Sequence, residues 1–224
     1  MKKHRLLSLF LSFALLLPLF ASFSAEAYED FTLDARAGLL IEADTGEILY
    51  EKNAHQENYP ASLTKIMTAL LVFEAIDEGK LSLSDSVTAT ESAFEGLASD
   101  GSTADIVPGE TMTVEQLLNC MLIVSANETC NILGEYISGS VEAFVARMNE
   151  RASELGCEHT HFANATGLHN SQHYTTAWDL YLITREAMKH EKFMEICNSK
   201  SYTVPATNMT EKPRELHSTN FLIS

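Results

Sequence analysis

Lysine and arginine are scarce in this chain. Its 224 residues hold 15 Lys and Arg against 31 Asp and Glu, which gives a formal net charge of −16 at pH 7. Nucleic-acid binding depends on clustered basic side chains that neutralise phosphates. The charge balance therefore excludes a nucleic-acid partner, although it indicates no particular substrate.

Long apolar runs are absent after the first 23 residues. Residues 2–5 carry three basic side chains, residues 6–23 are largely apolar, and Ala25-Glu26-Ala27 has the small-x-small pattern of a cleavage site. This order predicts a signal peptide over residues 1–27 and an exported protein. An uncleaved anchor is the alternative, because the apolar stretch is almost long enough to span a bilayer. Pro18 and the Ala-x-Ala pattern favour cleavage.

Cysteine is rare too, and its spacing fits no metal or redox motif. Export would permit disulfides between the four cysteines, which are Cys120, Cys130, Cys157 and Cys197. Two of them, Cys120 and Cys130, fall in apolar helical segments. A free cysteine in such a place behaves as a small buried hydrophobe, which is the interpretation preferred here.

Two contrasting patterns open the remainder of the chain. Residues 38–53 hold two apolar runs around a turn, and Gly46 can take the positive φ that a tight β-hairpin requires. Residues 62–78 are apolar almost all round and end at Gly79. A helix without a polar face is buried, so we expect a central helix there.

Helix-capping patterns mark three later helices. Thr113 with Gln116, and Ser125 with Glu128, have the spacing of a capping box, and Ser140 precedes a third apolar stripe. A further helix is predicted over residues 176–188, and short extended segments after residue 199. One hairpin among so many helices would leave strand edges unpaired, so we expect the sheet to be incomplete.

The chemistry centres on Ser62-Leu63-Thr64-Lys65, which is the one Ser-x-x-Lys in the chain. On a helix, residues three apart lie on one face and can touch. A buried lysine loses part of its preference for the charged form, so its neutral amine can take a proton from a serine hydroxyl. About one such match arises by chance in a chain of this size, but few chance matches would open a buried helix.

Ser125-Ala126-Asn127 is a second candidate element. Its hydroxyl could relay a proton, and the Asn127 amide could bind a substrate backbone. The alternative is that Ser125 merely caps its helix with Glu128. Ser218-Thr219-Asn220 has the same Ser-x-Asn pattern, but only Ser125 follows Ser62 at a distance that could form an opposing wall of one site.

Together these elements resemble the penicillin-recognising serine enzymes, in which S-x-x-K, S-x-N and K-T-G recur. The wider resemblance, from about Gly38 to the end, is to the D-alanyl-D-alanine carboxypeptidases of peptidase family S11. It is carried by the segments LLIEADTGEILYEKNA, YPASLTKIMTALL, VPGETMTVEQLLNCMLIVSANETCNIL and THFANATGLHNSQHYTTAWDL. The resemblance implies a multi-layer α/β, β-lactamase/transpeptidase-like fold over residues 28–224, with a helical lobe beside an antiparallel sheet.

The resemblance also implies a role for each matched residue. Ser62 would attack the carbonyl of the penultimate D-alanine of a peptidoglycan stem peptide, and Lys65 would be the general base. Ser125 would pass a proton to the leaving amine, and Asn127 would bind the peptide. β-Lactams would acylate Ser62 as substrate mimics, and no metal or organic cofactor is implied.

The sequence departs from the family pattern at the third motif. Neither Lys-Thr-Gly nor His-Thr-Gly occurs in the 224 residues. In the family this triad lies on a strand that holds the substrate carboxylate and supplies one oxyanion N–H. We therefore expect a C-terminally truncated domain without the strand that completes the site, without the family's C-terminal membrane anchor, and with doubtful activity on its own.

Residues 157–176 form a polar loop rich in histidine, where a zinc site is conceivable. The loop resembles the family's active-site rim segment, which binds no metal, so we predict no metal at its four histidines, His159, His161, His169 and His173. A class A β-lactamase is a rival interpretation that would need a catalytic Glu in this region. Glu158 is the one candidate, and its context does not match. A catalytically dead wall-binding homologue is the other alternative.

Overall fold

The computed structural model describes residues 33–223, so the signal peptide predicted over residues 1–27 lies outside the described part. From Arg36 onward the chain clusters as one compact unit. No helix within residues 33–223 combines the length and the apolar character needed to cross a membrane.

The predicted hairpin is confirmed as β1 (Gly38–Ile41) and β2 (Ile48–Lys52), paired antiparallel. The turn between them contains Gly46 with φ 75°, the left-handed conformation that the sequence pattern required. The Glu42 carboxylate accepts from both the backbone N–H and the hydroxyl of Thr45, which fixes the start of the turn. Among the described strands, neither β1 nor β2 pairs with any other strand.

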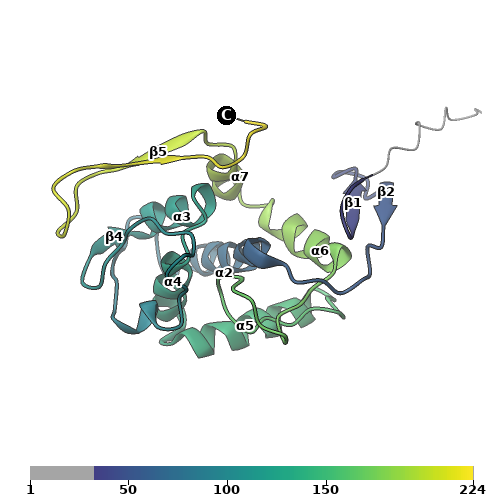
Figure 1. Ribbon diagram of the computed structural model, residues 1–224, viewed down its shortest axis with the longest axis horizontal. Coiled ribbons are helices and arrows are strands. Elements are labelled where there is room, and N and C mark those ends of the chain that lie inside the picture. The colour runs from purple at the N-terminus through teal and green to yellow at the C-terminus, as the bar shows by residue number, and fades with distance from the viewer. Residues whose placement is uncertain (1–32, 224) are drawn as a thin grey trace, which may run out of the picture. The chain divides into compact units, whose positions relative to one another are not determined.

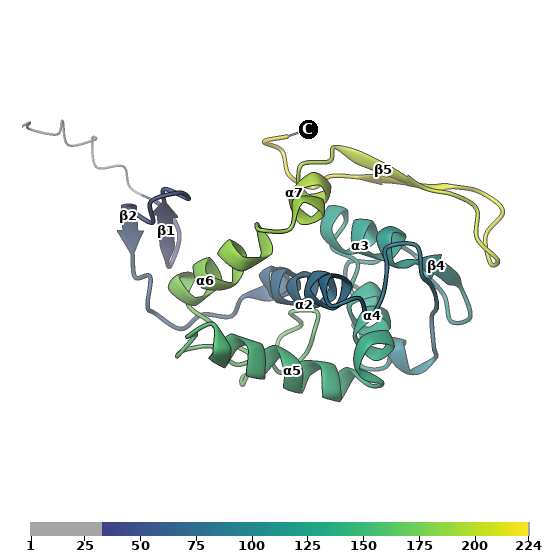
Figure 2. The same ribbon diagram turned by 180° about the vertical axis from the view of Figure 1, so that it is seen from behind.

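The predicted central helix is confirmed as a 3₁₀ turn, η2 (Ala61–Thr64), that continues as α2 (Lys65–Asp77). Residues from every side of α2 are buried, and Leu70 and Val72 are both 0% exposed. Figure 1 and Figure 2 show α2 between α3 and α5. The helices that pack on it include α3 (Val114–Ile123), α4 (Glu128–Ser138), α5 (Val141–Glu154) and α6 (Ala177–Ala187).

Two of the three predicted helix caps are confirmed. Thr113 and Gln116 form a reciprocal capping box at α3, and the Ser140 side chain accepts from the backbone N–H of Ala143 at α5. The capping box of Ser125 with Glu128 is wrong. Asn127 rather than Ser125 is the N-cap residue of α4, and the Glu128 carboxylate binds a neighbouring loop instead of the Ser125 backbone.

Two further short pairs of antiparallel strands accompany the helices. The β3–β4 pair joins Ser86–Thr88 to Thr111–Thr113, with η3 (Ser92–Phe94) between them. The extended pattern after residue 199 is a second hairpin, β5 (Ser201–Val204) and β6 (Arg214–His217). It is preceded by α7 (Glu191–Cys197), a single short helix without a side-chain cap that the sequence patterns did not predict.

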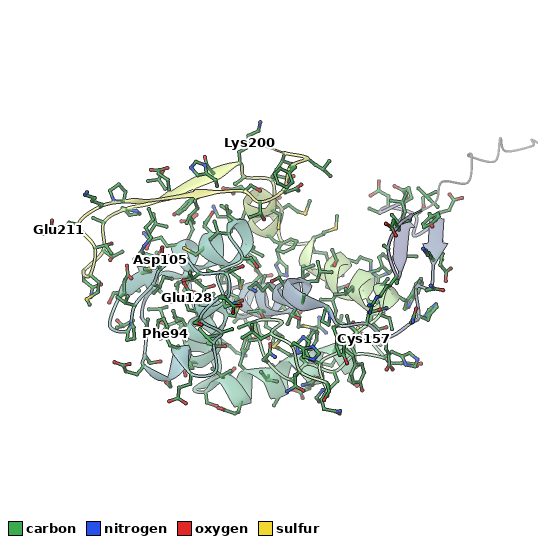
Figure 3. The ribbon with its side chains drawn as sticks, viewed as in Figure 1. Phe94, Asp105, Glu128, Cys157, Lys200 and Glu211 are labelled. Atoms are coloured by element: carbon green, nitrogen blue, oxygen red, sulfur yellow. The ribbon has the colours of Figure 1, made fainter. Side chains whose placement is uncertain are left out.

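A buried ion pair anchors this second hairpin. The Arg214 guanidinium donates to both oxygens of the buried Glu110 carboxylate, at 2.6 and 2.8 Å. The Thr207 hydroxyl adds a bond of 2.6 Å to the same carboxylate. In Figure 3, Lys200 and Glu211 mark the near end and the far tip of the hairpin. The pair therefore holds the hairpin against the turn that precedes β4.

All four cysteines are free, and three of them are buried. Burial raises the pKa of the Cys120 and Cys130 thiols to about 12. Both thiols are therefore neutral at physiological pH and pack as small apolar groups, as the sequence indicated.

Gly134 provides a test of the packing between α4 and α5. A Cβ added there would lie 2.9 Å from Cδ1 and 3.2 Å from Cβ of Phe144, which is 0% exposed. Gly134→Ala should overpack the interface at a cost of about 1–3 kcal/mol, against about 1 kcal/mol gained in helix propensity. Urea unfolding should show a net loss of stability.

Phe144→Leu supplies the matched control for that measurement, because it removes the ring atoms that the new methyl group would meet. The double variant should lose less free energy of unfolding than the sum of the two single changes. Strict additivity would contradict the packing explanation.

Candidate active site

Ser62 and Lys65 meet where η2 passes into α2. Ala61 takes a positive φ of 48°, which is uncommon for a residue with a side chain and turns the chain sharply before the helix. Ser62 is exposed, whereas Lys65 is only 3% exposed. The Lys65 Nζ lies 3.2 Å from the Ser62 Oγ, so the three-residue spacing brings the pair together as the sequence predicted.

Three oxygens surround the Lys65 amine. Besides Ser62, its Nζ donates to the Asn127 Oδ1 at 2.8 Å and to the Thr166 carbonyl at 2.7 Å. Burial lowers the pKa of Lys65, while the Glu128 carboxylate partly opposes that shift. The lowered pKa makes the neutral amine, which can accept a proton from Ser62, more accessible than that of an exposed lysine.

Ser125 and Asn127 lie on the turn that leads into α4. Ser125 has a positive φ of 61°, and among the residues described it is the one whose buried side-chain oxygen has no hydrogen-bond partner. Strained backbone and an unpaired hydroxyl are both costly and occur together mainly where function requires them. Asn127 reaches Lys65 directly, whereas the Ser125 hydroxyl forms no hydrogen bond with it.

Glu128 fastens a second loop over this turn. Its Oε1 accepts from the Thr103 hydroxyl at 2.8 Å and from the Ala104 backbone N–H at 2.7 Å. The Asn127 backbone N–H donates to the Ser102 carbonyl at 2.9 Å. Figure 3 shows Glu128 in the interior, where α4 begins. The sequence pointed to Glu128 only as part of a cap, so its role in holding this loop was missed.

The polar loop after α5 forms the other side of the site. The Asn164 Oδ1 accepts from the backbone N–H groups of Thr166 and Gly167 and from the Thr166 hydroxyl, which makes a tight turn. Gly167 packs directly on the nucleophile segment, since a Cβ there would lie 1.9 Å from the Ala61 carbonyl oxygen. The sequence analysis did not predict the contact of Thr166 with Lys65. The one local sign of a close approach was Gly167, a glycine within a polar loop.

Three of the four histidines of that loop lie in different environments. His173 is 2% exposed and bonded on both ring nitrogens, to Thr64 and to Ala163. His159 pairs with Glu57 at the surface, and the ring of His169 meets Tyr59 edge to face. Within residues 33–223, no three His, Cys, Asp or Glu side chains are grouped so that they could hold a metal ion.

Solved structures with a similar fold define the class of protein. Penicillin-binding protein 6B of Escherichia coli matches with a TM-score of 0.77 and 29% identity, over 88% of this chain and 62% of that one. A mutant of the Streptomyces K15 DD-transpeptidase matches with a TM-score of 0.79 and 30% identity, over 87% of this chain and 78% of that one. The fold is therefore the β-lactamase/transpeptidase-like α/β fold of the penicillin-binding DD-peptidases.

The family follows from the sequence comparison. The model of the family Peptidase_S11, D-alanyl-D-alanine carboxypeptidase, matches residues 23–223, and the chain belongs to this family. The D-alanyl-D-alanine carboxypeptidase DacF of Bacillus subtilis is 39% identical over 204 residues, which are 91% of this chain and 51% of that protein. DacC of Escherichia coli is 35% identical over 89% of this chain and 51% of that protein. The chain thus spans about half the length of these curated relatives.

Two glycines allow the close contact of Gly167 with Ala61 to be tested. Gly167 and Gly156 both have positive φ, 90° and 81°, so alanine strains the backbone at either position. Only at Gly167 would the new Cβ also meet other atoms, because nothing lies within 4 Å of it at Gly156. Gly167→Ala should therefore lower the urea midpoint clearly further than Gly156→Ala, which costs about 1–3 kcal/mol from strain alone. Equal losses would contradict the contact.

Proposed function

We propose that this chain carries the acylation machinery of a serine-type D-alanyl-D-alanine carboxypeptidase. The observation that supports this most directly is the buried Lys65 amine, 3.2 Å from the oxygen of an exposed Ser62. The names of the relatives indicate the substrate class, a peptidoglycan stem peptide that ends in D-Ala-D-Ala. Penicillin-binding protein 6B among the similar structures supports β-lactams as covalent inhibitors.

The proposed reaction begins when neutral Lys65 takes the proton from the Ser62 hydroxyl. The Ser62 oxygen attacks the carbonyl carbon of the penultimate D-alanine, and the carbonyl electrons move to its oxygen. When the tetrahedral intermediate collapses, the C–N bond breaks, and the departing amine takes a proton and leaves as D-alanine. Water then attacks the ester on Ser62 and releases the shortened peptide, which restores the hydroxyl.

In the proposal, Ser125 assists departure of the leaving group and Asn127 binds the peptide. The unpaired hydroxyl of Ser125 is available to pass the proton to the leaving amine. The Asn127 amide oxygen already binds Lys65, which leaves its NH₂ group to donate to a peptide carbonyl. A second oxyanion donor and a carboxylate-binding group are still needed, because the chain contains no Lys-Thr-Gly or His-Thr-Gly.

We further propose that the reaction takes place after export. The relatives act on the cell wall, and the basic, apolar and Ala-Glu-Ala sequence over residues 1–27 is that of a cleaved signal peptide. Contact with the membrane surface through a C-terminal anchor rests on the family resemblance alone.

A class A β-lactamase is less well supported by the geometry. That mechanism needs a carboxylate to activate the deacylating water. The loop segment that faces Lys65 presents Asn164, Thr166 and Gly167 instead, and Glu158 is an exposed residue earlier in the loop.

The first test is covalent labelling of the chain with a fluorescent penicillin. Because one oxyanion donor is worth about 10²–10³ in rate, the incubation has to be long. Mass spectrometry of the digested product should place the adduct on the peptide that contains Ser62, and Ser62→Ala should abolish it. An adduct on Ser125 would overturn the assignment, and no adduct at all would favour a non-catalytic wall-binding protein.

The second test concerns the proton acceptor. Lys65→Arg keeps the positive charge but cannot supply a neutral amine at any working pH. Its acylation rate should fall about 10²–10⁴-fold, the usual contribution of a general base. Lys189→Arg, at an exposed position on α6's C-terminal side, is the matched control and should keep the parent rate. Retained acylation in Lys65→Arg would show that Lys65 acts only as a fixed charge.

A further inference from the structure

The imidazole of His173 is buried beside the catalytic segment but has no part in the proposed reaction. Its Nδ1 lies 3.0 Å from the backbone nitrogen of Ala163, and its Nε2 lies 2.7 Å from the Thr64 hydroxyl. The Ala163 nitrogen carries a hydrogen, so Nδ1 must accept. The ring proton therefore sits on Nε2, which donates to Thr64, and the imidazole is neutral. Burial, with a smaller effect of His161, lowers the pKa of His173 to about 4, in agreement with that state.

These two bonds link the two sides of the Lys65 environment. Thr64 immediately precedes Lys65, and Ala163 opens the turn whose Thr166 carbonyl accepts from the Lys65 amine at 2.7 Å. A parallel bond of 2.8 Å runs from the Thr68 hydroxyl, one helical turn along α2, to the Ala165 carbonyl. The loop is therefore bound to α2 at successive points, and His173 provides the link nearest the start of the helix.

The turn between Ala163 and Gly167 is held together by its own hydrogen bonds and therefore moves as one piece. The Asn164 side chain accepts from Thr166 and Gly167 and donates to the Leu168 carbonyl at 2.8 Å. Because the turn is bonded within itself, a displacement at Ala163 moves the Thr166 carbonyl with it. The amine that this carbonyl contacts is buried, since Lys65 is only 3% exposed.

We propose that His173 is a positioning residue for Lys65: by holding the turn of residues 163–167 on Thr64, it keeps the Thr166 carbonyl on the amine and water away from it. The proposal rests on the proposed function of Lys65 as general base. A histidine that served only to fill the core would contribute to stability without affecting the Lys65 amine.

Other groups around Lys65 also influence its pKa in the parent chain. Its own segment presents the Ser62 hydroxyl, and α4 presents the Asn127 amide, the Cys130 thiol and the Glu128 carboxylate. None of these is bonded to His173, so a change at His173 reaches Lys65 through Thr64 and the turn of residues 163–167. Burial is the largest cause of the lowered Lys65 pKa, and entry of water should therefore raise that pKa.

The test is to titrate Lys65 directly, without relying on catalysis. The ¹³Cε resonance of Lys65, identified by its loss in Lys65→Arg, is followed against pH in the parent chain, in His173→Phe and in Thr64→Val. His173→Phe keeps a ring beside Phe162, and Thr64→Val keeps the shape of the partner while it removes the hydroxyl. The Lys65 pKa should rise by about one unit in both variants, which is the size of shift that partial solvation produces.

Thr160→Val is the matched control for Thr64→Val. Thr160 lies on the same loop, but its hydroxyl bonds to Thr175 and Asp179 rather than to His173. The Lys65 pKa should stay at the parent value in this variant. If His173→Phe fails to fold, as circular dichroism would show, the same-shape Thr64→Val decides the matter.

Penicillin acylation gives a second readout with a specific form. A pKa raised by one unit leaves about one-tenth as much neutral amine near pH 7, so the rate in His173→Phe should fall about tenfold and recover as the pH rises. A loss of rate that no pH restores, or an unchanged Lys65 pKa in both folded variants, would overturn the positioning role. If the parent is not acylated while the titration shifts as expected, the proposed function fails and the positioning of the amine by His173 stands.

Discussion

The burial of one amine is the constraint on which the rest of this site depends. Removing a charged ammonium from water costs several kcal/mol even after the protein relaxes, unless acceptors replace the lost water. Lys65 has three such acceptors, the Ser62 hydroxyl, the Asn127 amide oxygen and the Thr166 carbonyl. They come from three separate parts of the chain. The fold must bring those parts together before a lysine can be held where its neutral form is accessible.

Two of the three segments are bent into conformations that cost free energy by themselves, and the third makes an unusually close contact. Ala61 and Ser125 have positive φ, and Gly167 lies so close to Ala61 that no side chain fits there. Such strain persists only where the surroundings determine the conformation more strongly than the local preference does. Here the surroundings are helices: the buried α2 packs against α3, α4, α5 and α6, and Glu128 and His173 bond the flanking loops on either side.

Local patterns in the sequence were sufficient for the parts of the fold that are themselves local. The hairpin around Gly46, the buried helix after Ser62 and the caps at Thr113 and Ser140 all depend on residues within a few positions of one another. The cap of Ser125 with Glu128 failed because a distant partner competed for the same carboxylate, and that partner loop wins once the chain is folded. The short α7 has no side-chain cap to mark its start.

The site likewise combines one contact between residues close in sequence with contacts between residues far apart. The contact of Ser62 with Lys65 follows from helical spacing, whereas Asn127 lies 62 positions from Lys65 and Thr166 lies 101 positions away. The family resemblance supplied Asn127, but it could not supply a backbone carbonyl, because any side chain at position 166 leaves that group in place. The same holds for His173, which in sequence is one of four histidines in a polar loop. Burial distinguishes His173 from the other three histidines. Its ring is enclosed between Thr64 and Ala163, where it is neutral and bonded on both nitrogens, and these two bonds allow it to hold the loop in place.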